Sequence, residues 1–427
     1  MKKHLIFAAK LLVILLCGII AGYALLLAVY ALPVEPMAEN LRLSIPALNG
    51  EWSKEDSYEQ LIPGYVTTQL DNSTDAAMLL AAVHENDLPI LTRAVEAPRY
   101  YGRANAYYTM LDWAAGKDET ITSGPIARYW HGYLVVLKPL LMVMSYLDIR
   151  MLMMMAQSVL LAAVIAGLCK KNLAKLIAPF LLSLLCVTPS VTGFSLQFST
   201  ALYTMLIAMI ALLYLPKKWF SLHGQMIFFL LTGMLTSYVD YLTYPLVTFC
   251  VPFVVCLFTY PEASAKDEWK RAVLLGVCWI AGYLGMWAGK WVLAGFFGRE
   301  QWFWPNLMAT ISTRTSESSG EIELSFLQVL MAVFSPFFKR AYLAAGLAAV
   351  IAYACAWLRS RRYPALSGQF TRRVILLGVA VLPFAWFFCT QNHTYNHSFY
   401  TSRTLMASAF AAGCLLMTFL RAKRGEN

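Results

Sequence analysis

Charged side chains are scarce in this chain. Of its 427 residues, 14% are Asp, Glu, Lys or Arg, whereas 59% are apolar. This balance is far from that of soluble globular domains, and no shift in composition marks a second, soluble domain. Instead, apolar runs of about 17 to 25 residues recur, each long enough to cross a hydrocarbon core of about 30 Å as a helix. The sequence therefore predicts an all-α polytopic membrane protein.

The chain also lacks a thiol framework and the common nucleotide-binding motifs. All nine cysteines lie within or at the end of apolar runs, which argues against disulfides and against a thiol metal site. There is no phosphate-cradling glycine loop, serine nucleophile elbow or protein-kinase motif set. These absences argue against ATP-driven or nicotinamide-dependent chemistry on the cytoplasmic side.

The basic residues are placed as in a membrane protein, although the net charge of +10 suggests nucleic acid at first. Short Lys and Arg clusters lie beside apolar runs, at 2–3, 170–171, 217–218, 270–271, 359–362, 372–373 and 421–424. This is the positive-inside pattern, in which basic loops face the cytoplasm. We therefore expect a multi-pass plasma-membrane protein with both termini cytoplasmic and no nucleic-acid partner.

About ten apolar runs are expected to span the bilayer, and the first is expected to be retained because it exceeds a signal-peptide core. They are 5–32, 149–168, 174–191, 199–215, 223–239, 243–259, 271–293, 341–358, 374–390 and 403–420. The stretches 133–147 and 326–338 are interrupted or short, so we expect them to be interfacial or re-entrant; twelve spans would result if both crossed. The expected organisation is a first transmembrane helix (1–32), a long, mostly helical extracytoplasmic loop with interfacial helices (33–148) and a transmembrane helical bundle (149–427).

The polar sequence gathers in the loops expected outside, which places the working side there. Its first candidate site is the acidic pair Asp71 and Asp75, just before the apolar run 76–83. One carboxylate could act as a general base, or the pair could hold a divalent cation. The alternative is structural: Asp71 or Ser73 would cap a helix, and the acids would favour its N-terminus.

A second candidate follows at Arg128, Tyr129, Trp130 and His131, where the chain re-enters the membrane. Arginine binds phosphate bidentately, and aromatic faces stack on sugar rings, so these residues are predicted to bind substrate. An interfacial aromatic belt is the alternative interpretation.

Two further outer turns carry polar side chains near membrane depth. Asp240 and Tyr244 lie in one of them; an acid there faces a cavity or a partner, or is a solvated turn residue. His393, His397 and Arg403 lie in the other, and the histidines would share one helix face at a spacing compatible with a metal. No glutamate completes a zinc motif, so the metal stays unknown. Arg403 suits a phosphate anchor.

The layout and these motifs resemble the C-type superfold of integral membrane glycosyltransferases: a cytoplasmic N-terminus, one span, a long acidic first outer loop and then a helical bundle. The superfold usually places its acidic pair soon after the first helix, where Glu35 and Glu39 stand here. The better organised pair in this sequence is Asp71 and Asp75, so the identity of the base stays open.

The resemblance implies a transferase that moves a sugar from a polyprenyl-phosphate donor to an envelope acceptor at the outer face. Arg128 and Arg403, together with Lys339 or Arg340, would hold the donor phosphate, and Asp71 or Asp75 would be the base. Membrane lipid and the lipid-linked sugar would be its partners. Two alternatives stay open: a transporter or flippase of a lipid-linked or small solute, and a non-catalytic envelope-assembly protein.

Overall fold

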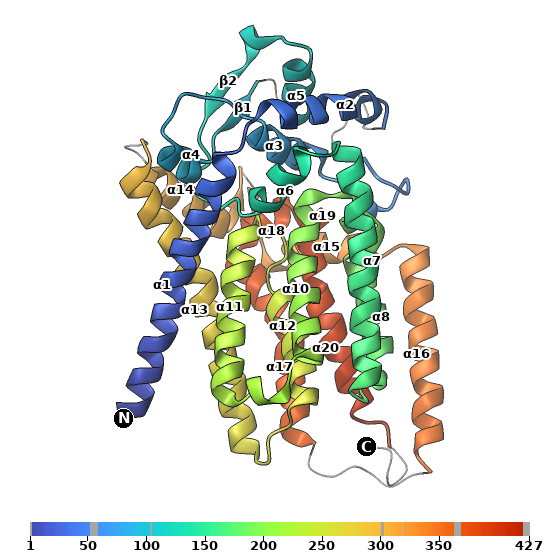
Figure 1. Cartoon of the computed structure of the whole chain (residues 1–427). Helices are drawn as coiled ribbons and strands as arrows, with labels where there is room; N and C mark the ends of the chain where they lie inside the picture. Colours follow the sequence, from blue (N-terminus) through green and yellow to red (C-terminus); the bar gives the residue numbers. More distant parts are fainter. Residues whose placement is uncertain are drawn as a thin grey trace.

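The computed structural model describes residues 2–51, 59–102, 105–299, 303–320, 322–362 and 369–421. Seven of its helices are long and apolar enough to cross a membrane: α1 (Lys2–Tyr30), α7 (Tyr146–Lys170), α10 (Leu196–Tyr214), α11 (Leu222–Val239), α13 (Ala265–Phe297), α16 (Arg340–Ser360) and α17 (Phe370–Cys389). They stand side by side as a bundle (Figure 1). The expected all-α polytopic architecture is therefore confirmed.

The described residues between α1 and α7, namely 31–51, 59–102 and 105–145, fold over one end of the bundle, and we call them the head segment (Figure 1). Its helices are α2 (Glu35–Glu51), α3 (Asn72–Ala82), α4 (Ile90–Glu96), α5 (Ala106–Ala114) and α6 (Leu134–Leu141), with the short 3-10 turns Val66–Thr68 and Asp118–Thr120. A small antiparallel ribbon, β1 (Arg99–Tyr101) with β2 (Thr122–Gly124), was not predicted from the sequence.

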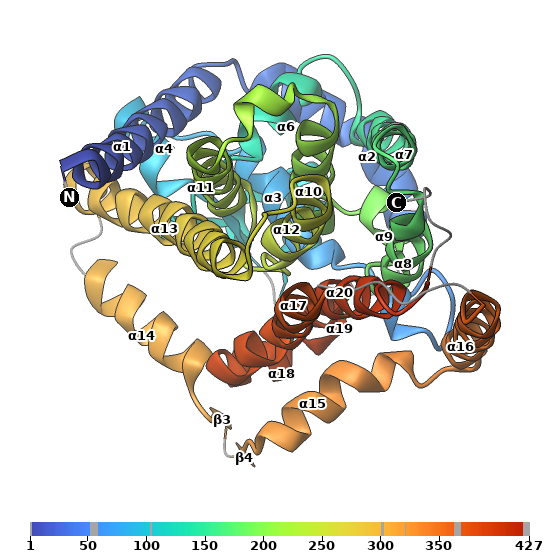
Figure 2. The same cartoon turned by 90° about the horizontal axis from the view of Figure 1, so that it is seen from below.

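Shorter helices complete the bundle. They are α8 (Ile177–Ser183), α9 (Pro189–Phe194), α12 (Val247–Thr259), α14 (Phe303–Thr315), α15 (Phe326–Phe334), α18 (Gln391–Asn396), α19 (Ser398–Thr401) and α20 (Leu405–Met417). The 3-10 turns are Ala174–Leu176, Leu184–Cys186, Lys217–Trp219, Ser335–Phe337 and Ser402–Thr404, and a ribbon of β3 (Ser318–Ser319) and β4 (Ile322–Glu323) follows α14. Seen along the bundle, α14, α15 and α16 lie at the periphery (Figure 2).

The sequence suggested one continuous span at 174–191, but the structure breaks this run into separate helices. Helix α8 ends in a 3-10 turn, and Thr188 then takes a left-handed backbone conformation (φ 52°) before Pro189 begins α9. Proline suits the first turn of a helix and cannot continue one, which explains the break. The stretch 133–147 contains the eight-residue α6 and the first two residues of α7; α6 is about 12 Å long at 1.5 Å per residue, too short to cross a bilayer.

Helices α11 and α13 form the closest pair in the bundle. A Cβ atom placed on Gly233 would lie 2.1 Å from the Trp279 carbonyl oxygen, and one on Gly282 would lie 2.1 Å from that of Leu230. Glycine at both positions lets the two backbones touch, as is usual for helix pairs in membranes. Helix α12 lies behind this pair with almost every side chain buried.

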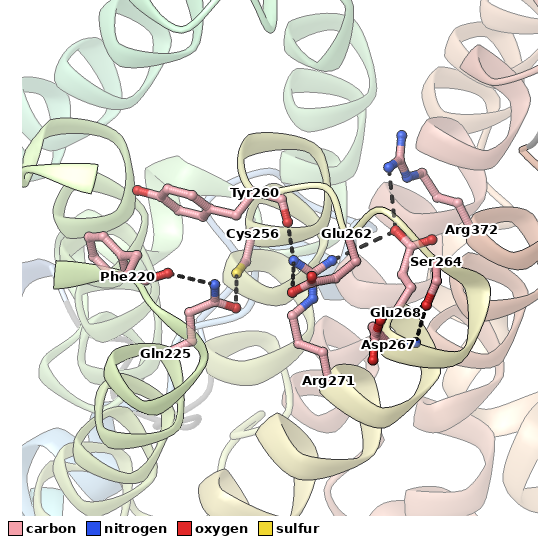
Figure 3. A network of polar contacts seen from close by, with 10 residues as sticks. All are labelled: Phe220, Gln225, Cys256, Tyr260, Glu262, Ser264, Asp267, Glu268, Arg271 and Arg372. Carbon is pink, nitrogen blue, oxygen red and sulfur yellow. Dashed lines mark hydrogen bonds and ion pairs between the residues drawn. The ribbon is translucent and has the colours of Figure 1, made fainter. Parts of the chain in front are cut away.

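The end of the bundle opposite the head segment is tied by a polar network (Figure 3). The buried Arg271 guanidinium bonds the Tyr260 carbonyl and lies 3.6 Å from Glu262 and 3.7 Å from Glu268. Arg372 of α17 also pairs with Glu268, at 3.3 Å. The network therefore joins α13 and α17 to the end of α12.

Candidate functional site

Asp71 is the N-cap residue of α3, which confirms the capping interpretation. Its Oδ1 accepts a hydrogen bond from the Thr74 backbone N–H (2.9 Å), and its Oδ2 accepts one from the Thr74 hydroxyl (2.8 Å). Burial raises the pKa of this carboxyl, while the bonds from Thr74 and the charge of Arg403 oppose that shift. Each oxygen accepts one bond, so the carboxylate keeps lone pairs for a further donor.

Asp75 lies one turn further along α3 and holds the N-terminus of another helix. Its Oδ1 accepts from the Ser195 hydroxyl (3.1 Å) and the Gln197 N–H (3.0 Å); its Oδ2 accepts from the Leu196 N–H (3.1 Å) and the Tyr146 hydroxyl (3.5 Å). Burial raises its pKa to about 7 against the effect of these donors. Asp75 thus accepts the first two N–H groups of α10 from the head segment, beside the N-cap residue Ser195, and its four bonds leave no lone pair for a substrate.

The residues of the predicted motif 128–131 have different environments in the structure. The Trp130 indole N–H donates to the Met286 carbonyl (2.7 Å), and its ring is buried between the head segment and α13. Trp130 is therefore part of the packing. Arg128 is exposed, while Tyr129 is buried with its ring edge against Tyr241 (5.0 Å between centroids).

His131 connects two tyrosines to the backbone. Its Nε2 lies 2.9 Å from the Ile126 carbonyl, so this nitrogen carries the proton, and its Nδ1 then accepts from the Tyr241 hydroxyl at 2.5 Å. The Tyr133 hydroxyl lies 3.2 Å from that of Tyr241. Burial, aided by nearby cations, lowers the pKa of His131 to about 3, so the imidazole is neutral.

Two arginines lie over the Tyr129 ring, and a third, whose guanidinium lies over the Tyr101 ring (4.4 Å to its centre), acts electrostatically on Tyr241. The guanidiniums of Arg128 and Arg314 each lie 5.5 Å from the ring centre of Tyr129, and Tyr241 lies within electrostatic reach of Arg99 and Arg128. Among the residues that the structure describes, none of these three arginines forms an ion pair with a carboxylate. The Nε of Arg99 is also buried without a hydrogen-bond partner. We call Arg99, Arg128, Arg314, Tyr129 and Tyr241 the arginine–tyrosine cluster.

Asp240 and Tyr244 shape the turn between α11 and α12. Asp240 Oδ2 accepts from the Thr243 N–H (3.0 Å), and its Oδ1 accepts from the hydroxyls of Thr243 and Thr200 (3.4 Å for Thr200). Burial raises the pKa of Asp240 to about 6. The Tyr244 hydroxyl bonds the Phe198 carbonyl. Both side chains therefore fasten this turn to α10.

The two predicted histidines lie together at α18: His393 is one of its residues, and His397 is its C-cap residue. Their ring centroids are 5.0 Å apart; His393 Nε2 meets the Leu242 carbonyl at 3.1 Å, and the His397 ring stacks on Tyr400. Burial lowers the pKa to about 3 for His393 and about 4 for His397. Within the described ranges, no group of three or more His, Cys, Asp or Glu is arranged to hold a metal ion.

Arg403 is buried and bound by backbone groups. Its guanidinium donates to the carbonyls of Phe399 (2.8 Å), Val187 (3.4 Å) and Thr67 (3.4 Å), and it lies 4.0 Å from the ring centre of Phe198. These contacts join α19 and α20 to the head segment. Arg403 is also electrostatically coupled to Asp71.

Tyr400 connects the predicted acids to the cluster. Its buried phenol lies within electrostatic reach of Asp71, Asp240, Arg314 and Tyr129. The structure thus gathers residues from the head segment, α14 and the α11–α12 turn at one end of the bundle. Arg99 and Arg314 were missed because neither belongs to a local motif; Arg314 reaches Tyr129 only through the tertiary packing of α14.

An apolar groove of about 280 Å³ opens on the side of the bundle below this region. It runs between α6, α7, α10 and α11, and its wall is almost entirely apolar. Val136, Ile207 and Leu235 at its mouth are 63%, 50% and 41% exposed. Tyr133 and Thr200 line the groove. The Tyr133 hydroxyl bonds that of Tyr241, and the Thr200 hydroxyl bonds Asp240, so the groove reaches these polar groups.

Comparison of the chain with known protein families, with curated proteins and with solved structures finds no match. The site is therefore interpreted from its own geometry.

Proposed function

We propose that the protein is a membrane glycosyltransferase that takes a sugar from a polyprenyl-phosphate donor at the outer face of the plasma membrane. One observation carries this proposal: an apolar groove open to lipid reaches Tyr133, whose hydroxyl meets Tyr241 of the arginine–tyrosine cluster. An apolar channel joined to unpaired cations matches a ligand with a long hydrocarbon chain and a phosphate.

The cluster supplies the charge that such a phosphate requires. Arg128 and Arg314 approach Tyr129 from the head segment and from α14, and Arg99, which lies over the Tyr101 ring, acts electrostatically on Tyr241. Guanidinium groups bind phosphate bidentately and stabilise the negative charge that develops when it leaves. The Arg403 guanidinium, by contrast, donates its hydrogen bonds to backbone carbonyls. In this proposal Arg403 therefore stabilises the fold, and the three arginines of the cluster bind the phosphate.

The transfer step needs one base. An acceptor hydroxyl attacks the anomeric carbon of the sugar, the bond from that carbon to the phosphate oxygen breaks, and the phosphate leaves with the electron pair. The hydroxyl proton passes to a carboxylate, and inversion requires no glycosyl-enzyme intermediate. Of the two predicted bases, Asp71 keeps lone pairs and Asp75 does not, so the proposal assigns the base to Asp71.

The proposed topology has ten spans and cytoplasmic termini. The basic clusters at 2–3, 170–171, 217–218, 270–271 and 372–373 border helix ends that lie opposite the head segment in Figure 1. The positive-inside rule then makes that end cytoplasmic and the head segment external. The seven long helices supply seven of these spans. The other three are runs that are shorter or more broken: 174–191, 243–259 and 403–420.

The test is the pool of polyprenyl-phosphate sugars in cells with the wild type, a deletion, or Asp71→Asn, by mass spectrometry of extracted lipid. One lipid-linked sugar should accumulate both in the deletion and in cells that express the variant at the wild-type level. An unchanged pool in both would exclude this donor class and favour the transporter or assembly alternatives.

A further inference from the structure

A pocket of about 390 Å³ opens on the head segment, and the proposed transfer step does not use it. It is bordered by α2, β1 and α5, which lie on the side of the head segment away from the bundle, and by the end of α3 (Figure 1). Its charged lining residues are Glu35, Arg42 and Glu85, and its aromatic lining residues are Tyr100 and Trp113. The volume lies within the range of sites for small ligands.

The three charged side chains of this pocket are exposed, and within the described residues none of them forms an ion pair. Glu35 and Arg42 lie seven residues apart on one face of α2, about 10 Å from each other along the helix axis. Ala38 lies between them on α2 and also lines the pocket, so a short side chain leaves the space there open. The Arg42 guanidinium lies over the Trp113 ring, 4.8 Å from its centre. The charges of this pocket are therefore available to a ligand.

The donors and acceptors of the pocket determine which ligand it fits. A guanidinium only donates hydrogen bonds, and a carboxylate only accepts them, whereas a hydroxyl group does both. A ligand with many hydroxyl groups therefore satisfies the arginine and the two glutamates together. An anionic ligand would meet an excess of negative charge, because two carboxylates stand against one guanidinium. Tyr100 and Trp113 add aromatic surface of the kind that packs against sugar rings.

We propose that this pocket binds an uncharged oligosaccharide and is a remote subsite for the acceptor of the transfer; the second part rests on the proposed function. Helix α3 connects the pocket with the proposed base: its C-cap residue Val83 lines the pocket, and its N-cap residue is Asp71. The helix has 11 residues and is about 16 Å long. The acceptor is then a glycan that extends from the pocket to Asp71, and its remote end contributes binding energy to the reaction.

The experiment measures glycan binding to the purified full-length protein in a polyoxyethylene ether detergent, which contains no sugar. An array of neutral and acidic glycans identifies the sugar, and isothermal titration then measures its disaccharide and its hexasaccharide. Arg42→Gln, and separately Glu35→Gln with Glu85→Gln, should weaken hexasaccharide binding at least about tenfold, the loss expected for one charge-assisted contact. Glu39→Gln removes an exposed glutamate of α2 outside the pocket lining, and this matched control should bind as wild type does.

The hexasaccharide should bind more tightly than the disaccharide, and equal affinities would contradict an acceptor that extends from the pocket toward Asp71. The proposal is overturned if the array retains no glycan or only acidic ones. It is also overturned if the pocket variants bind as wild type does while their thermal midpoints are unchanged. No sugar donor takes part in this experiment, so its failure is distinct from failure of the proposed transferase activity, which the lipid-linked sugar pool reports.

Discussion

Replacing the two acids of α3 by asparagine should have opposite consequences for stability and for turnover. At Asp71, an asparagine can keep both contacts with Thr74. Its oxygen accepts from the backbone N–H, and its amide donates to the Thr74 hydroxyl, which reverses from donor to acceptor. Because asparagine is as good an N-cap as aspartate, the free energy of unfolding should fall by less than about 1 kcal/mol.

At Asp75 no such exchange is available. One oxygen accepts from the Gln197 N–H and the other from the Leu196 N–H, and neither donor can become an acceptor. An asparagine in either orientation points its amide at a backbone N–H, leaves that group unpaired and removes the charge that the α10 N-terminus favours. A loss of about 3 kcal/mol follows from one buried unsatisfied donor and weakened charge-assisted bonds.

The assay is SDS-induced unfolding of both purified variants, combined with measurement of the lipid-linked sugar pool. Asp71→Asn should unfold like wild type yet accumulate donor, whereas Asp75→Asn should unfold at lower SDS. Equal destabilisation by both substitutions would refute the assignment of different roles to the two acids.

Three further outcomes follow from the same structure. Burial lowers the pKa of His393 to about 3, so this side chain stays neutral in the fold while the unfolded chain takes up a proton below about pH 6.5. Its share of the fall in unfolding free energy should be about 1.4 kcal/mol per pH unit between pH 6.5 and 3, in addition to the shares of His131 and His397, and unfolding titrations of His393→Gln should lack this share. Gly132→Ala would place a Cβ atom 2.3 Å from the Tyr238 ring and should lower the unfolding free energy by about 1–3 kcal/mol in the same titration, and a wild-type value would count against the close contact. Leu235→Trp should fill the mouth of the groove and weaken polyprenyl-phosphate binding about tenfold by native mass spectrometry, while Leu231→Trp, one turn away and equally lipid-facing, should bind as wild type; equal binding would exclude the groove.

The sequence was informative about helices because apolar runs and capping residues are local signals. The long apolar runs became helices, and Asp71 begins α3 as its side chain predicts. Contacts between distant segments were not accessible in this way. Asp75 reads as a first-turn acid of α3 in the sequence, yet its partners lie some 120 residues later at the start of α10.

The same limit applies to the candidate site. Tyr129 and Arg128 were predicted to bind substrate because of their residue types, and they do lie at one place. Arg314 meets Tyr129 only through the packing of α14 against this end of the bundle, and no local pattern marks it. Trp130 and Tyr244 were selected for the same chemistry but make packing contacts, since burial is decided by the tertiary fold.

The most direct test of the central claim is the affinity of the protein in nanodiscs for a polyprenyl phosphate, measured by native mass spectrometry. Arg314→Gln should weaken binding about tenfold, and the triple variant of Arg99, Arg128 and Arg314 should weaken it at least about a hundredfold. Arg340→Gln, which removes an exposed arginine from the start of α16, should bind as wild type does. An unchanged affinity in the triple variant would contradict the assignment of the arginine–tyrosine cluster as the phosphate site.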